Sequence, residues 1–237
     1  MAVCPVLLYL QHKIPDYHDN YVKRRIFMAR LLYIEASPRK DRSASIEVAK
    51  AFIDAYKASH RADVIDTIDL WKTDLPPFDG DTVNAKYSIL HGQQKTPAEE
   101  KAWKAVERII ADFKSADKYL FSMPMWNFGI PYKLKHYLDI LIQPSYTFSY
   151  STTEGYKGMV TGKPVAIAYA RGGSYPKGTP EMSYDFQIPY FQLLLGFIGF
   201  TDIKQIVVEP MLMAEPRQKQ DIMEAARKEA RLIAQNF

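Results

Sequence analysis

Hydrophobic and polar residues follow two patterns that alternate along this chain. Short apolar runs, typical of buried strands, are followed by segments whose apolar residues lie three and four positions apart, which is typical of helices packed on one face. The runs that predict strands are residues 30–36, 63–70, 117–123, 163–169 and 202–209. The spacings that predict helices fall within residues 46–56, 99–113, 134–142, 185–199 and 222–237.

Two segments depart from this alternation. Residues 71–97 contain Pro76-Pro77 and Asp79-Gly80-Asp81, which predict a long loop region with room for one short helix. Residues 146–150 alternate like an edge strand or one arm of a hairpin that closes near Gly155 and Gly158. Because strand and helix otherwise alternate throughout, the pattern predicts an α/β domain with one parallel sheet and helices on both of its faces.

The first 27 residues stand apart from this pattern. Residues 2–10 are apolar, but the run is too short to span a bilayer and no basic leader precedes it. Met28 directly precedes the first strand. We therefore expect one domain at residues 28–237, and we interpret residues 1–27 as an extension that results from a mis-assigned start, with a short ordered arm as the alternative.

Composition and net charge limit the kinds of partner, crosslink and metal site that the chain is expected to have. The chain has 237 residues with a formal net charge of +4, and its basic residues are not gathered with aromatic residues into a run, so we expect no nucleic-acid partner. Cys4 is the only cysteine, which excludes an internal disulfide and fits a reducing cytoplasm. The five histidines lack metal-ligand spacing, so we expect no metal site.

Serine-rich residues 37–45 follow the first strand and precede the first helix. Such a position favours phosphate, because free N–H groups and the helix dipole both attract an anion. Ser43 suits the helix cap, and Ser37 and Ser45 add small hydroxyl donors. The alternative is a plain turn with a serine cap.

The loop at residues 124–131 follows the third predicted strand. Pro124 and Pro131 restrict its backbone, and Asn127 lies between the aromatic residues Trp126 and Phe128. An amide flanked by aromatic rings suits a flat heteroaromatic ligand that needs both stacking and hydrogen bonds. The alternative is that the two rings face the core.

A third loop, Arg171-Gly172-Gly173, follows the fourth predicted strand and would let the backbone approach a ligand closely. A Gly-Gly pair alone is weak evidence, since it also marks ordinary turns. The three loops carry more weight together, because parallel strands place their carboxyl ends at one edge of a sheet, where open α/β sheets bind ligands.

With these loops in view, the chain from Met28 to about Ile233 resembles the FMN-dependent NADH:quinone oxidoreductases and azoreductases of the flavodoxin-like superfamily. The resemblance rests on Ser37 with Ser43-Ala44-Ser45, Pro124-Met125-Trp126-Asn127-Phe128, Ala170-Arg171-Gly172-Gly173 and the run Leu195-Gly196-Phe197-Ile198-Gly199-Phe200. The chain departs from the family at Trp126, where tyrosine is frequent, and at Ala170, where serine is frequent.

The resemblance implies a doubly wound five-stranded parallel sheet of order 2-1-3-4-5, a cytoplasmic homodimer and one FMN per subunit near the dimer interface. Ser37, Ser43, Ala44 and Ser45 would hold the phosphate. Met125, Trp126, Asn127 and Phe128, with Ala170, Arg171, Gly172 and Gly173, would contact the ring. NADH or NADPH would reduce the flavin, and a quinone or aromatic azo compound would then accept two electrons in a ping-pong reaction, with no side chain as nucleophile and no membrane partner.

Some roles and rival functions stay open. Trp126 and Phe128, with Tyr146 or Phe148, are candidates for a substrate-facing surface, although edge-strand packing explains the last two at least as well. Arg171 either adds positive charge beside the ring or faces solvent. The rival functions are a flavodoxin-like electron carrier, a hydrolase of the phosphodiester in acyl carrier protein, and a non-enzymatic regulatory module of flavodoxin fold. Flavodoxins are usually acidic, which this chain is not.

Overall fold

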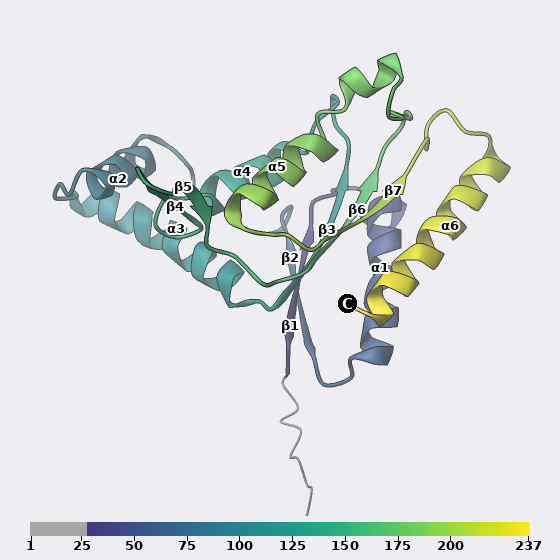
Figure 1. The fold of residues 1–237 in the computed structure, drawn as a ribbon, viewed down its shortest axis with the longest axis horizontal. Helices are drawn as coiled ribbons and strands as arrows, with labels where there is room; N and C mark the ends of the chain where they lie inside the picture. Colours follow the sequence, from purple (N-terminus) through teal and green to yellow (C-terminus); the bar gives the residue numbers. More distant parts are fainter. Residues whose placement is uncertain (1–27) are drawn as a thin grey trace, which may run out of the picture.

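A five-stranded parallel sheet forms the centre of the protein, as the computed structural model of residues 28–237 shows (Figure 1). Its strands are β1 (Arg30–Glu35), β2 (Val64–Asp69), β3 (Lys118–Pro124), β6 (Val165–Ala170) and β7 (Ile203–Val208). The order across the sheet is β2-β1-β3-β6-β7. The resemblance implied 2-1-3-4-5. The difference arises from two further strands, which lie between β3 and β6 in the chain and outside the sheet.

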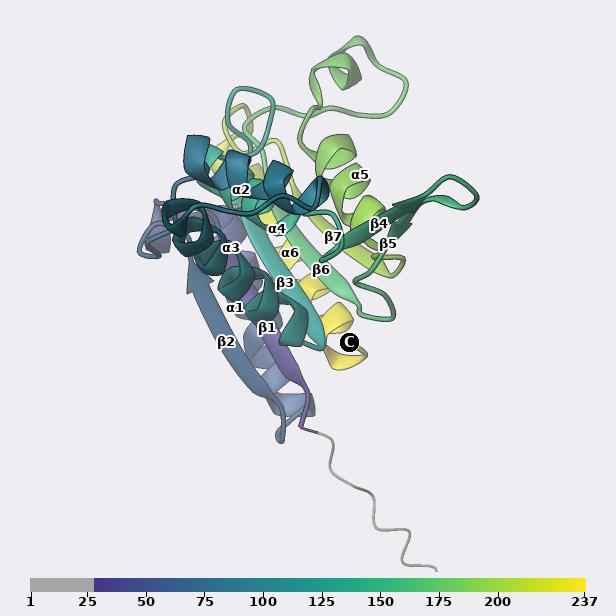
Figure 2. The same ribbon diagram turned by 90° about the vertical axis from the view of Figure 1, so that its left-hand side faces the viewer.

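Helices cover both faces of this sheet (Figures 1 and 2). The helices α1 (Ala44–Ser59) and α6 (Pro216–Gln235) pack on one face. The helices α3 (Pro97–Ser115), α4 (Tyr132–Leu141) and α5 (Ile188–Ile198) pack on the other, and α2 (Gly80–Leu90) lies against α3. Two short 3-10 helices, η1 (Lys40–Arg42) and η2 (Pro180–Tyr184), lie in loops. None of the helices in residues 28–237 is long and apolar enough to cross a bilayer.

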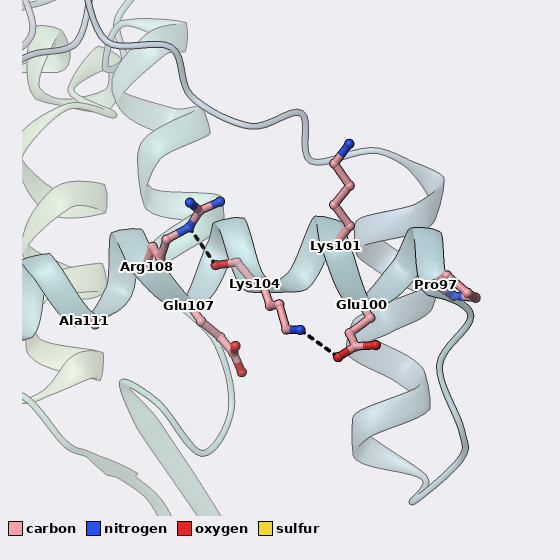
Figure 3. A pocket seen from close by; sticks show the side chains of 7 residues that line it. All are labelled: Pro97, Glu100, Lys101, Lys104, Glu107, Arg108 and Ala111. Atoms are coloured by element: carbon pink, nitrogen blue, oxygen red, sulfur yellow. Dashed lines mark hydrogen bonds and ion pairs between the residues drawn. The ribbon is translucent and has the colours of Figure 1, made fainter.

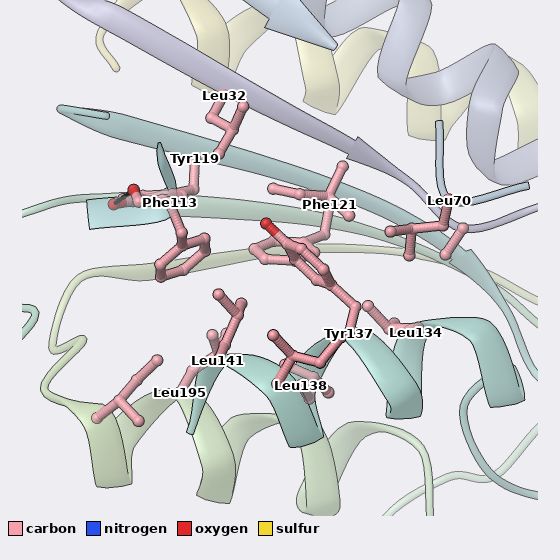
Figure 4. Packing of buried hydrophobic residues seen from close by; sticks show 14 of the residues in the cluster. Leu32, Leu70, Phe113, Tyr119, Phe121, Leu134, Tyr137, Leu138, Leu141 and Leu195 are labelled. Carbon is pink, nitrogen blue, oxygen red and sulfur yellow. Dashed lines mark hydrogen bonds between the residues drawn. The ribbon is translucent and has the colours of Figure 1, made fainter. Parts of the chain in front are cut away.

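The central strands are apolar on both faces, because each face is covered by helices. Along β6, Ala166 and Ala168 face α1 and α6, while Val165, Ile167 and Tyr169 face α5. The alanines leave room for α1 and α6 to approach the sheet. The opposite layer holds larger side chains, among them Phe121, Tyr137 and Leu195 (Figure 4).

The helix α2 was predicted only as a short helix within a loop region, and it spans eleven residues. Its pattern is weak because its buried side chains are small or polar: Thr82, Ala85 and Ser88. The side chain of Asp79 caps its start by accepting a hydrogen bond from the Thr82 N–H at 3.3 Å. The apolar period that marks the other helices is absent from this segment.

The strands β4 (Phe148–Ser151) and β5 (Gly155–Gly158) form an antiparallel hairpin beside α5 (Figure 2). Of the two alternatives for residues 146–150, the hairpin arm is therefore the one observed. The hairpin is joined to α5 by a hydrogen bond of 2.8 Å from the Val160 N–H to the Ile198 carbonyl. The interpretation of residues 1–27 as an extension lies outside the described residues.

Close packing at Gly158 generates a prediction about stability. A Cβ built there would lie 2.3 Å from the Gly199 nitrogen, whereas one built at Gly196 meets nothing within 4 Å. We expect Gly158→Ala to lower the free energy of unfolding in urea by about 1–3 kcal/mol through overpacking. The control Gly196→Ala, on an exposed helical position, should be neutral or stabilise by up to about 1 kcal/mol. Equal stabilities of the two variants would contradict the packing described.

Candidate functional site

The loops that follow β1, β3 and β6 line one cavity of about 290 Å³, together with the loop that follows β7. They meet because parallel strands place all their carboxyl ends at the same edge of the sheet. The lining residues are Ser37, Arg39, Ser43, Ala44, Pro124, Met125, Trp126, Ala170, Arg171, Gly172, Met211 and Leu212.

Most, but not all, of the predicted site residues share this cavity. Eight of the twelve line it: Ser37, Ser43, Ala44, Met125, Trp126, Ala170, Arg171 and Gly172. Ser45 is fully buried, with its hydroxyl oxygen 3.2 Å from that of Ser43. Gly173 lies against Tyr175. Asn127 lines a neighbouring cavity, and Phe128 is exposed beside it.

The serine loop presents its hydroxyls at the start of α1. Ser37, Ser43 and Ser45 are all buried. Ser43 occupies the N-cap position of α1, as predicted, but its side chain makes no capping hydrogen bond. The first N–H groups of an α-helix have no partner within the helix. Ser43 and the first turn of α1 therefore keep hydrogen-bonding capacity that an anion in the cavity could use.

Lys40 belongs to the same loop but is held away from the cavity. Its ammonium lies 2.6 Å from Glu35 Oε1 and 2.5 Å from Asp69 Oδ1, at the ends of β1 and β2. Burial lowers the pKa of Lys40, but hydrogen bonds with Asp69 and Glu35 outweigh burial, and the net shift is upward. The ion pairs thus fix the loop, in which Lys40 has φ of 50°.

A tight turn at residues 126–129 separates the two cavities. Trp126 and Gly129 exchange both backbone hydrogen bonds, at 3.0 and 2.9 Å. The central residues Asn127 and Phe128 have φ of 46° and 67°, which is the φ pattern of a type I′ turn. A bulky side chain at positive φ is strained, and such strain is concentrated at functional sites. The turn holds the Trp126 side chain between the two cavities, since Trp126 lines both.

The neighbouring cavity is the larger of the two, at about 780 Å³, and it is mainly aromatic. Its rings come from Phe78, Trp126, Tyr132, Phe186 and Tyr190. The amide of Asn127, the imidazole of His136 and an ion pair of α4 between Lys135 and Asp139 add polar groups. A flat aromatic molecule with hydrogen-bonding oxygens suits this lining.

Arg171 does not face solvent, which was one of its two expected placements. Its side chain is 4% exposed, and its guanidinium nitrogens lie 2.6 Å from Asp185 Oδ2 and 2.9 Å from Glu209 Oε2. The ring of Tyr175 lies 5.2 Å from the guanidinium carbon. Two carboxylates therefore neutralise the positive charge that this arginine was expected to offer to a ligand.

Arg39, Met211 and Leu212 also line the cavity, and the sequence analysis did not assign them to the site. The position of each of these residues in the sequence could have indicated its place in the site. Arg39 lies within the serine loop, and Met211 and Leu212 follow the last strand at the same edge of the sheet. Backbone hydrogen bonds join this last loop to the third one, from Met211 N–H to the Arg171 carbonyl at 2.9 Å and from Leu212 N–H to the Gly172 carbonyl at 3.0 Å.

The chemistry of the smaller cavity fits a phosphorylated, partly aromatic ligand. Its lining includes Arg39 and Arg171 but no carboxylate side chain. Hydroxyls and the start of α1 lie on one side, and Met125, Trp126 and Leu212 supply apolar surface. A phosphate is compatible with this donor set, and it would meet no acidic residue in the lining.

Tyr146 and Phe148 do not take part in either cavity, so the packing alternative describes them correctly. The Tyr146 hydroxyl donates to Glu107 at 2.5 Å and accepts from the Trp103 indole N–H at 3.1 Å. The ring of Phe148 lies 4.7 Å from that of Phe197 in α5. Both residues hold the hairpin region against its neighbouring helices.

A further hollow follows the outer face of α3 and contains none of the predicted site residues (Figure 3). Its polar contacts include the ion pair of Glu100 with Lys104 at 2.8 Å, within the helix, and the hydrogen bond from Tyr146 to Glu107. Within residues 28–237, no three His, Cys, Asp or Glu side chains are grouped closely enough to hold a metal ion. The edge of the sheet is therefore the best candidate site.

Comparison with known proteins identifies the family. Residues 29–233 match a family described as having a flavodoxin-like fold. The chain is 50% identical over 210 residues to an FMN-dependent NADH:quinone oxidoreductase of Nitratidesulfovibrio vulgaris strain DP4, which covers 89% of this chain and 100% of that protein. A protein of the same name from Desulfotalea psychrophila is 49% identical, with 89% and 98% covered.

Two solved structures are also similar. An azoreductase of Bacillus anthracis strain Sterne has a TM-score of 0.82 at 31% identity and covers 89% of this chain and all of that one. An FMN-dependent NADH-azoreductase of Bacillus anthracis strain Ames Ancestor, solved in complex with FMN, has a TM-score of 0.80 at 28% identity, with 88% and 99% covered. This chain therefore belongs to the flavodoxin-like family that includes the FMN-dependent NADH:quinone oxidoreductases and azoreductases.

Proposed function

We propose that this protein is an FMN-dependent oxidoreductase that transfers two electrons from NADH or NADPH to quinones and aromatic azo compounds by a ping-pong mechanism. The observation that carries the proposal is the convergence of three strand exits on one cavity whose lining holds serine hydroxyls, the start of α1 and Arg39, but no carboxylate side chain. The names of the relatives described above support the same activity. When bound, FMN would supply the redox chemistry, and the protein would supply binding, orientation and exclusion of water.

The phosphate would lie at the start of α1. Ser37 and Ser43 are buried in the lining, and the Ser43 side chain is not used as a helix cap. Arg39 lines the same end of the cavity and could add a charge-assisted hydrogen bond. Lys40 would act indirectly, because its ion pairs with Glu35 and Asp69 fix the loop that carries these groups.

The flavin ring would lie between the turn at residues 125–128 and the loop at residues 170–173. Trp126 offers a face for stacking, and the backbone of Gly172 allows close approach. Asn127 and Phe128 would be held beside the ring by their strained backbone. The electron acceptor would lie against the open face of the ring, in the space that the nicotinamide leaves, beside the larger aromatic cavity, where the Asn127 amide can donate to a quinone oxygen.

We also propose that the protein acts as a cytoplasmic homodimer, as the resemblance implies. Exposed apolar side chains on the hairpin and α5, namely Tyr150, Tyr156 and Leu193, offer a surface that a second copy could cover. Light scattering in solution would then give twice the mass of one chain, and a monomer mass would refute this point.

The proposed activity has a direct test. The purified protein should be yellow, and it should oxidise NADH or NADPH when a benzoquinone, a naphthoquinone or an aromatic azo dye is supplied. Initial rates at several concentrations of both substrates should give parallel double-reciprocal lines, which are the signature of a ping-pong reaction. A protein that binds no FMN on reconstitution, or that binds FMN and reduces none of these acceptors, would contradict the proposal.

Replacement of Ser43 tests the phosphate seat. Asp and Asn both suit an N-cap as well as Ser does, so Ser43→Asp and Ser43→Asn should both fold. We expect Ser43→Asp to weaken FMN binding at least about tenfold, or about 1.4 kcal/mol, because a carboxylate repels the phosphate. Riboflavin, which lacks the phosphate, should lose much less affinity. Fluorescence titration with both ligands measures this, and equal losses for FMN and riboflavin would place the phosphate elsewhere.

Replacement of Asn127 tests the amide beside the ring. Glycine accepts the positive φ of this residue, so Asn127→Gly removes the amide without adding strain. We expect flavin retention or the rate of flavin reduction by NADH to fall by about two- to tenfold, the value of one hydrogen bond. Asn127→Ala should lose about 1–2 kcal/mol of stability in addition, because alanine is strained at this φ. Unchanged retention and unchanged reduction in Asn127→Gly would exclude the role.

A further inference from the structure

The segment at residues 184–187 lies across the turn that separates the two cavities. The Phe186 N–H donates a hydrogen bond of 3.0 Å to the Phe128 carbonyl, and the ring of Tyr184 stacks on that of Phe128 at 5.3 Å. Phe186 also forms part of the wall of the larger cavity, next to Trp126 and Asn127. The shape of this wall therefore depends on where the segment is held.

Asp185 fixes this segment from both sides. One carboxylate oxygen, Oδ1, accepts hydrogen bonds from the Gln187 and Ile188 N–H groups at 3.0 and 3.1 Å, where α5 begins. The other oxygen, Oδ2, lies 2.6 Å from Arg171 Nη1. Asp185 thus ties the start of α5 to the loop after β6.

Arg171 is a suitable anchor because it cannot move into solvent. Its side chain is 4% exposed, and Glu209, at the end of β7, holds its Nε from another direction at 2.9 Å. Its backbone is fixed as well, since its N–H donates to the Val208 carbonyl and its carbonyl accepts from the Met211 N–H. A buried arginine whose guanidinium lies between two carboxylates, with a hydrogen bond to Asp185 and an ion pair to Glu209, and whose backbone makes two hydrogen bonds is a rigid support for a neighbouring loop.

We propose that Arg171 and Asp185 are a positioning pair that sets the wall of the acceptor cavity, an inference that rests on the proposed function. The pair holds Phe186 against the 126–129 turn, so a planar acceptor meets a preformed aromatic wall beside Trp126. Asp185 lines neither cavity and contacts the acceptor only through Phe186. Asp185 therefore governs how well the acceptor binds, rather than how tightly FMN is held, whereas Arg171 also lines the smaller cavity.

The test uses Asp185→Asn in the flavin-loaded protein. Asparagine still accepts the two N–H bonds that begin α5, and Arg171 still pairs with Glu209, so no buried charge is left without a partner. We expect the KM for menadione, a bicyclic naphthoquinone, to rise at least about fivefold, with the Kd for FMN unchanged. Hydrogen exchange of the Phe186 amide should accelerate at least about tenfold, because its bond to Phe128 is less well held.

The matched control is Asp202→Asn, which removes a carboxylate from an exposed ion pair with Lys204. This variant should leave the KM, the Kd for FMN and the exchange of Phe186 as they are. An unchanged KM and unchanged exchange in Asp185→Asn would overturn the proposal. Parallel losses of FMN affinity and thermal stability, without a specific rise in KM, would also overturn it by showing a structural role alone.

The experiment distinguishes failure of the proposed function from failure of this inference. A wild-type protein that does not reduce menadione with NADH would refute the acceptor role of the cavity, and with it this inference. Retained activity in the wild type, with no change of KM in Asp185→Asn, would refute only the positioning pair. Arg171→Lys gives a second check, because a lysine can pair with Asp185 or Glu209 but lacks the planar fork that reaches both. Its KM should rise as well, and a KM equal to that of the wild type would count against the pair.

Discussion

The parallel register of β1, β3 and β6 is the constraint on which the site depends. Neighbouring strands pair in parallel over most of their length, so their carboxyl ends reach the same edge of the sheet. The loops after these strands are far apart in the chain and meet only because the strands run in one direction. Helices packed on both faces keep the register, since a slip would expose the apolar side chains of β3 and β6.

Ion pairs decide which positively charged side chains are available to a ligand in the cavity. Lys40 and Arg171 both lie in loops that line or border the site, yet each is held by two carboxylates. Such pairs contribute little to stability by themselves, because desolvation opposes the attraction between the charges. Their value here is geometric. They fix the loops around the cavity and leave Arg39, with the N–H groups of α1, as the positive features open to a ligand.

The strained turn at residues 126–129 links the two cavities. Asn127 and Phe128 keep positive φ because the Trp126–Gly129 hydrogen bonds and the Phe186 N–H hold the turn. The strain has a cost, and the surrounding contacts offset it. The turn in this way places Trp126 in the lining of both cavities. A tyrosine, frequent in the family at this position, would present a smaller ring and a hydroxyl to both.

The sequence by itself determined the five sheet strands, the helices with a clear apolar period and eight residues of the shared cavity, because these follow from local spacing and from the common edge of parallel strands. It missed most of α2, whose buried side chains are small and polar. Only the tertiary structure showed that Asn127 lines a second cavity and that the Lys40 ammonium pairs with carboxylates outside the first cavity. It also showed that Arg171 is buried between Asp185 and Glu209. The ion pairs among these outcomes join residues that lie 5 to 38 positions apart in the chain, and the pattern of apolar and polar residues does not show which charges will pair.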